Sequence, residues 1–178
     1  MLHEGRAAKK ALEFGPIGES GLLDALRQII DDVASARSFE RALSIIVARV
    51  SMNLGTEVCS VYLSDPTTGA LRLVANDGLN PEAVGRVSLA KGEGVVGIVA
   101  ERAEPLNLEN ASTHEAYRFF EEIGEEPFNA FLGVPVIHNR RVLGVLAVQQ
   151  RDSRRFLDEE EAFLVTLAAQ LANEVAHA

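Results

Sequence analysis

The apolar positions of the chain repeat with a helical period at both ends and with a strand period in the middle. Between Ser20 and Val33 they recur every three or four residues, which predicts a helix with one buried face. A second helix is predicted between Ser38, a candidate N-cap, and Gly55, a candidate C-terminal cap. A third is predicted from about Asp158, because glutamates fill its first turn and an apolar stripe follows.

The middle of the chain predicts two hairpins. The first joins residues 57–63 to 71–75 through a turn with Pro and Gly, and the second joins 131–137 to 142–148. Between them we expect a loop at 76–81, a strand at 87–89, a helix at 95–100, an edge strand at 105–108 and an acidic helix at 114–124. Hairpins, and not repeated strand–helix–strand units, connect the central strands. The pattern therefore predicts an α+β fold with a mostly antiparallel sheet of about five or six strands.

Length and composition predict one globular domain. The chain has 178 residues, of which 47% are hydrophobic and 24% charged. Residues 1–19 show no sustained period and are expected to form a flexible or loosely docked lead-in, so that the domain spans 20–178. A single cysteine, Cys59, excludes an internal disulfide, and its position in the middle of an apolar strand predicts a buried, inert thiol.

The charge balance disfavours two classes of binding partner. The net charge of −9 argues against nucleic acid and against an anionic membrane surface, both of which need a positive footprint. No apolar run reaches about 18 residues and no secretion signal precedes the first helix, so a cytoplasmic location is expected. The histidines have no metal-ligand spacing, and we expect neither a metal nor a cofactor. Arg151, Arg154 and Arg155 lie beside the acidic start of the last helix, which favours caps and salt bridges over phosphate binding.

One glycine motif has the spacing of a dinucleotide fingerprint, Gly92-Glu-Gly-Val-Val-Gly97. That fingerprint requires a parallel strand before it and a crossover helix after it, and neither is predicted here. The favoured interpretation is a loop that packs tightly. Backbone N–H groups near Gly94 and Val95 remain candidates for holding a carboxylate or phosphate.

A ligand pocket is predicted from the aromatic residues around the loop-rich centre, residues 76–131. Long connections over one sheet face often line small-ligand cavities, and Asn107 is a candidate directing amide. The alternative is that these aromatics are simply core. The candidate binding set comprises Tyr62, Gly94, Val95, Asn107, Tyr117, Phe119, Phe131 and Gly133.

Five runs of sequence carry a resemblance to a known family: VCSVY (58–62), DGLNPEAV (77–84), AEPLNL (103–108), FLGVP (131–135) and VLAVQQ (145–150). Together they resemble a GAF domain, and within that family the N-terminal sensor domain of enzyme I of the nitrogen-related phosphotransferase system. The resemblance covers residues 22–171. It implies a sheet with the N- and C-terminal helices on one face and the ligand-pocket loops and helices on the other.

The resemblance also implies a function. Enzymes of this family take phosphate from phosphoenolpyruvate onto a histidine, but no histidine here lies in a matching motif, so a non-catalytic regulatory module is expected. It would sense a small metabolite, with glutamine or 2-oxoglutarate as the suspected signals, and would control downstream phosphotransferase domains. Cyclic-nucleotide and bilin signatures are not evident.

Two alternatives remain open. One is a ligand-free dimerisation module, in which the apolar stripes of the terminal helices form a four-helix contact between two chains; a homodimer through these helices is also expected of the sensor. The other is an enzyme like the GAF-type methionine sulfoxide reductases, for which Cys59 lacks a resolving partner.

Overall fold

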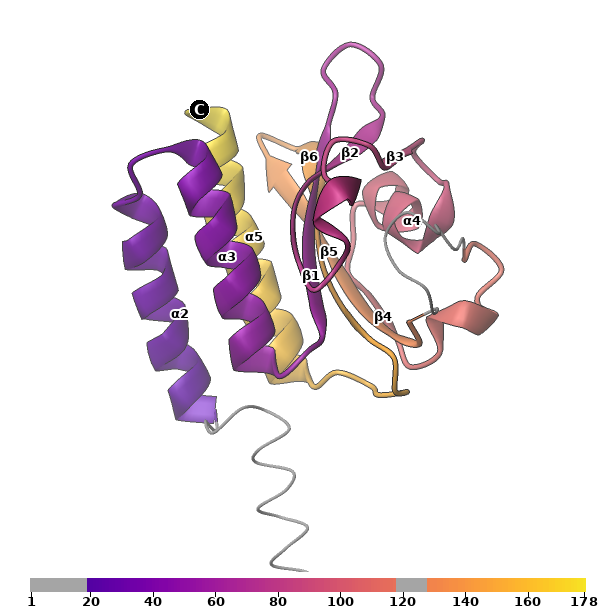
Figure 1. The fold of residues 1–178 in the computed structure, drawn as a ribbon, viewed down its shortest axis with the longest axis horizontal. Coiled ribbons are helices and arrows are strands. Elements are labelled where there is room, and N and C mark those ends of the chain that lie inside the picture. Colours follow the sequence, from indigo (N-terminus) through magenta and orange to yellow (C-terminus); the bar gives the residue numbers. More distant parts are fainter. Residues whose placement is uncertain (1–18, 118–127) are drawn as a thin grey trace, which may run out of the picture.

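A computed structural model describes residues 19–117 and 128–178, which form an antiparallel sheet with helices on both faces (Figure 1). The six strands are arranged in the order β3-β2-β1-β6-β5-β4. Their bounds are β1 Val58–Ser64, β2 Leu71–Asp77, β3 Ser88–Leu89, β4 Leu106–Leu108, β5 Ala130–His138 and β6 Arg141–Gln150. Both predicted hairpins and the predicted edge strand are confirmed, as is the α+β class.

Within the described residues, helices α2 (Glu19–Ala34), α3 (Phe39–Leu54) and α5 (Asp158–Ala176) lie on one side of the sheet and helix α4 (Gly94–Arg102) lies on the other (Figure 1). Helices α3 and α5 contact the strands directly, and α2 packs on both of them from outside. Helix α4 lies on the opposite face, which also carries the short 3₁₀ turns η1 (Pro81–Ala83) and η2 (Ala111–Thr113). The predicted division of helices between the two faces is therefore present.

Local capping chemistry explains where α3 begins and ends. The Ser38 hydroxyl accepts a hydrogen bond from the Arg41 N–H at 3.1 Å, and Gly55 closes the helix with a left-handed φ of 65°. Both caps were predicted. The helix predicted between Ser20 and Val33 is α2, which begins one residue earlier, at Glu19.

The sheet separates two apolar cores. The first lies between the sheet and helices α2, α3 and α5, and the second lies between the sheet and α4. Side chains of β1 alternate between them: Cys59 and Val61 face the three helices, whereas Val58 and Tyr62 face α4. This alternation decides which of the two cores each side chain of β1 joins.

Three further expectations either differ from the structure or concern residues outside the described part of the chain. Strand β2 continues to Asp77, so the predicted loop at 76–81 starts two residues late. Residues 114–117 form a bend and turn and not the start of a helix, and the rest of that predicted helix lies outside the described residues. The predicted lead-in, up to residue 18, also lies outside them.

Candidate functional site

The face of the sheet turned toward α4 carries three of the candidate residues. Tyr62 on β1 lies opposite Val145 on β6, and Gly133 on β5 lies opposite Ala147. Tyr62, Phe131, Val145 and Ala147 all belong to the second core, so Gly133 faces the same side. Cross-strand register thus brings Tyr62, Phe131 and Gly133 to one surface.

The absence of a side chain at Gly133 leaves room for the Phe131 ring on this surface. A Cβ at residue 133 would lie 2.6 Å from Phe131 Cζ and 3.0 Å from Val99 Cγ2 of α4. The missing side chain therefore allows the ring and the helix to lie directly on the sheet. Phe131 is fully buried, so this end of the face is filled by protein.

Two tyrosines border the same core. Tyr62 is buried, and burial raises the pKa of its phenol well above the ordinary value. Tyr117 is half-buried against this core, and burial raises the pKa of its phenol as well. Both hydroxyls therefore stay protonated at neutral pH and are able to donate hydrogen bonds. Phe119, the remaining aromatic candidate, lies outside the described residues.

The glycine motif at the start of α4 forms a tight loop. Gly92 and Gly94 have left-handed φ values of 82° and 69°, and the Gly92 N–H donates to the Gly97 carbonyl at 2.9 Å. A Cβ at Gly97 would lie 2.8 Å from the Ala90 carbonyl oxygen. The strand before the motif, β3, pairs antiparallel with β2, as the packed-loop interpretation requires. The first N–H groups of α4, including those of Gly94 and Val95, have no carbonyl partner within the helix.

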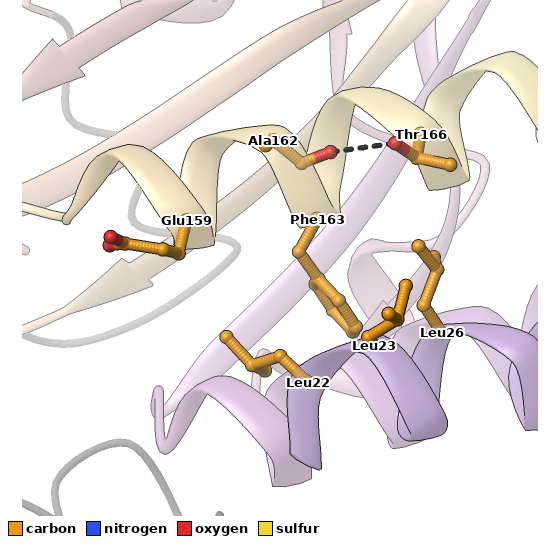
Figure 2. Close-up of a pocket in the computed structure, with 7 residues that line it drawn as sticks. All are labelled: Leu22, Leu23, Leu26, Glu159, Ala162, Phe163 and Thr166. Carbon is orange, nitrogen blue, oxygen red and sulfur yellow. Dashed lines mark hydrogen bonds between the residues drawn. The ribbon is translucent and has the colours of Figure 1, made fainter. Parts of the chain in front are cut away.

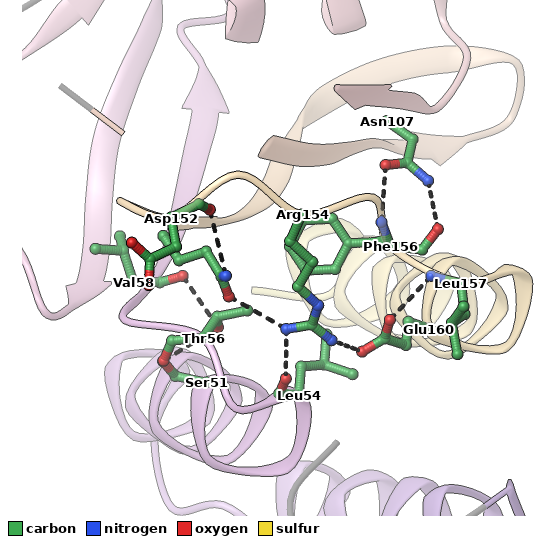
Figure 3. Close-up of polar contacts among 11 residues, drawn as sticks. Ser51, Leu54, Thr56, Val58, Asn107, Asp152, Arg154, Phe156, Leu157 and Glu160 are labelled. Carbon is green, nitrogen blue, oxygen red and sulfur yellow. Dashed lines mark hydrogen bonds and ion pairs between the residues drawn. The ribbon is translucent and has the colours of Figure 1, made fainter. Parts of the chain in front are cut away.

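Asn107 faces away from these residues. It lies opposite Leu132 of the first core, so its side chain projects toward the three-helix side of the sheet. There its amide nitrogen donates to the Phe156 carbonyl at 2.8 Å and its oxygen accepts from the Phe156 N–H at 3.2 Å (Figure 3). The amide is engaged with backbone on the wrong face for the pocket, and we leave Asn107 out of the candidate site.

A cluster of polar side chains fixes the position of residues 151–157, which connect β6 to α5 (Figure 3). Arg154 donates to the Glu160 carboxylate, to the Leu54 carbonyl at 3.2 Å and to Gln150 Oε1 at 3.2 Å, and its guanidinium lies 4.6 Å from the centre of the Phe156 ring. Glu160 is fully buried and also accepts from the Leu157 N–H at 2.9 Å, capping α5. Burial raises the pKa of the Glu160 carboxyl.

Of the three arginines beside α5, Arg151 and Arg154 have the predicted cap and salt-bridge roles. Besides Arg154, Arg151 pairs with Glu57, with its Nη1 2.5 Å from a carboxylate oxygen and its backbone N–H 2.8 Å from the other. Both contacts connect residues about a hundred positions apart in the sequence. They tie the end of β6 to the start of β1 and to the end of α3.

The described residues offer little other chemistry. Cys59 is fully buried, and burial raises the pKa of its thiol far above the ordinary range, which disfavours the reactive thiolate. Among residues 19–117 and 128–178, no group of three or more His, Cys, Asp or Glu side chains is placed to hold a metal ion. None of the helices in that part of the chain is long and apolar enough to span a membrane.

An apolar groove of about 710 Å³ opens between α2 and α5 on the outside of the helical layer (Figure 2). In Figure 2 the leucines of α2 approach Phe163 of α5 from the facing helix. Leu23 is 52% exposed, so the groove presents apolar surface to the solvent. The groove is lined by Leu22, Leu23, Leu26, Glu159, Ala162, Phe163 and Thr166.

Comparison with known proteins identifies the family. The model of the GAF domain matches residues 38–175. The chain belongs to the GAF domain family. It is 43% identical to the GAF domain from a phosphoenolpyruvate-protein phosphotransferase of Coxiella burnetii, with a TM-score of 0.86 over 90% of this chain and 96% of that one. For the corresponding domain from Acinetobacter the identity is 45% and the TM-score 0.80, over 88% and 93% of the two chains.

A curated relative extends beyond the GAF domain. A protein of the phosphoenolpyruvate-dependent phosphotransferase system of Escherichia coli (strain K12) is 46% identical over 151 residues. The match takes in 85% of this chain, and the chain spans about a fifth (20%) of that protein's length. The recognised resemblance to this GAF subfamily is thus confirmed.

Two polar residues on the sheet face turned toward α4 were not predicted. Within the described residues, Ser60 Oγ and Asn76 Nδ2 are buried atoms without a hydrogen-bond partner. Ser60 stands in an apolar strand, which is a sequence signal for a functional polar group. Its pairing with Asn76 follows only from the register of β1 and β2, which contains a bulge.

Proposed function

We propose that this GAF domain is a regulatory module that binds a small metabolite and thereby controls phosphoryl transfer by domains outside this sequence. The likeness to GAF domains of phosphoenolpyruvate-protein phosphotransferases carries the proposal. Such a module acts in the cytoplasm, performs no catalysis itself, and uses no metal, cofactor, nucleic acid or membrane. Glutamine and 2-oxoglutarate are the proposed signals of nitrogen status.

The proposed binding face is the sheet surface under α4. Tyr62 and Tyr117 supply hydroxyl groups, Phe131 and Gly133 shape one end, and Gly94 and Val95 supply helix N–H groups suited to a carboxylate. Both proposed signals carry carboxylates, which fits this donor-rich composition. For regulation, the metabolite has to bind one conformation of the domain more tightly than another.

A thermal-shift titration with glutamine and 2-oxoglutarate tests the sensor. A ligand that binds only the folded state raises the unfolding temperature in proportion to the logarithm of its concentration. Norvaline, which keeps the amino-acid group of glutamine and lacks its side-chain amide, is the matched control. The absence of any shift at millimolar concentrations of either signal would remove these two metabolites from the proposal.

A second function, dimerisation through the terminal helices, is favoured by the groove between α2 and α5. Its leucines and the exposed Val165 leave an apolar helical surface of the kind that a second copy buries. Sedimentation equilibrium of the purified chain at high concentration tests the homodimer. A strict monomer would contradict it.

A further inference from the structure

A row of small side chains crosses the sheet on the face turned toward α4. Starting from β5, the residues in register are Gly133, Ala147 on β6, Ser60 on β1 and Asn76 on β2. Larger residues stand on either side along the strands, among them Tyr62, Val58, Phe131 and Val145. The row therefore places short side chains next to one another between the bulkier ones of this face.

The two ends of this row differ. Over Gly133 the space is taken by the Phe131 ring and by Val99, as the close approach to a Cβ at that position shows. The opposite end is polar: Ser60 is completely buried, and its hydroxyl has no partner within the described residues. The Nδ2 atom of Asn76, directly opposite on β2, is also buried and also has no partner there.

Leaving buried polar atoms unpaired is costly. Native proteins satisfy almost all such groups, and each exception calls for a water, an ion or a ligand. Residues directly opposite in an antiparallel pair have Cβ atoms about 5 Å apart, so one small group is able to contact both side chains. The amide nitrogen is an obligatory donor, whereas the hydroxyl both donates and accepts. The group that satisfies both is an acceptor oxygen.

We infer that Ser60 Oγ and Asn76 Nδ2 together bind a carboxylate or amide oxygen of the regulatory ligand. This inference rests on the proposed sensor function and names the part of the site that recognises one polar end of the ligand. The carbon chain of the ligand then lies along Ala147 toward the Phe131 ring.

The first test concerns stability without ligand and compares two buried serines. Ser51 donates to the Thr56 carbonyl at 2.7 Å, whereas Ser60 has no partner. Ser51→Ala should lower the unfolding temperature by about 2–4 °C, the shift expected for loss of one hydrogen bond in a domain of this size. Ser60→Ala should leave it unchanged or raise it. A drop equal to that of Ser51→Ala would mean that the hydroxyl has a protein partner and would overturn the inference.

The second test measures binding of L-glutamine and 2-oxoglutarate by calorimetry in wild type, Ser60→Ala, Asn76→Leu and Ser51→Ala. We expect Ser60→Ala and Asn76→Leu each to weaken binding at least about tenfold, and Ser51→Ala to leave it unchanged. If Asn76→Leu fails to fold, Ser60→Ala alone decides.

The outcomes separate the inference from the function on which it rests. Wild-type affinity in Ser60→Ala would overturn the inference and leave the sensor proposal standing, with the two atoms satisfied by a buried water. No binding of either probe to the wild type would overturn both for this ligand class.

Discussion

At the residue scale, Asn107 joins the sheet edge to the segment that leads into α5. Both atoms of its amide bond the backbone of Phe156, 49 positions away. We expect Asn107→Ala to lower the free energy of unfolding by about 1–3 kcal/mol, because two hydrogen bonds are lost in a partly buried setting. Urea denaturation measures this change in the free energy of unfolding. Asn173→Ala, at an exposed position of α5, is the control and should change stability by less than about 0.5 kcal/mol. Equal effects of the two variants would contradict the role given to Asn107.

Glu160 is a buried carboxyl whose pKa lies above its ordinary value of 4.5, chiefly because of burial, while Arg154 acts in the opposite direction. The folded protein therefore keeps this proton at pH values where the unfolded chain has lost it, and stability falls as the pH rises through that window. Arg154→Met should cost about 3–5 kcal/mol at pH 7, because it leaves the carboxylate unpaired, and part of that loss should be recovered at pH 5.

The matched variants separate charge from packing. Glu160→Gln keeps an acceptor for the Leu157 N–H and loses the charge, while Arg154 keeps its hydrogen bonds to Leu54 and Gln150. We therefore expect it to change stability by only about 1 kcal/mol. Arg154→Met combined with Glu160→Gln should have a flat pH dependence over this window in urea denaturation. A pH slope that persists in the double variant would show that another group is responsible.

At the scale of elements, helix α4 has two backbone positions that should respond oppositely to substitution. Gly97→Ala should destabilise the domain by about 1–3 kcal/mol, because the new Cβ would lie 2.8 Å from the Ala90 carbonyl oxygen. Ala103 caps the helix with a left-handed φ of 54°, a conformation that favours glycine, so Ala103→Gly should stabilise by about 0.5–1 kcal/mol. Thermal unfolding of both variants checks the pair, and a loss of stability in Ala103→Gly would contradict the prediction.

The elements that the sequence predicted well are those marked by residues close together in the chain, such as helix caps and hairpin turns. Ser38 and Gly55 mark helix ends by their own chemistry, and the two hairpins follow from short-range alternation around their turns. Asn107 was assigned to the wrong face, because a strand of three residues gives no reliable alternation and its partner Phe156 is distant in sequence. Ser60 and Asn76 were missed for a related reason, since their pairing depends on long-range register.

At the scale of the whole molecule, hydrogen bonds from β4 connect the sheet edge beneath α4 to the segment that leads into α5. Leu106 and Leu108 pack on the second core beneath α4, while Asn107 between them holds the backbone just before α5. Arg154 ties the same connection to the end of α3 and to Glu160 of α5. A shift of β4 would therefore be transmitted to the start of α5.

The proposed dimer interface lies on the outer helical surface. Leu23 and Val165 are exposed at 52% and 41%, and Leu23 lines the groove between α2 and α5. Leu23→Glu should weaken self-association at least about tenfold, because dimer formation would bury an unpaired carboxylate against Phe163 and Ala162. Met52→Glu introduces the same charge at an apolar side chain of α3 that is 67% exposed and does not line the groove, and it should leave association unchanged. Sedimentation velocity over a concentration series measures both. If Met52→Glu were the variant that dissociated the dimer, the interface would lie on α3 and the groove would have another use.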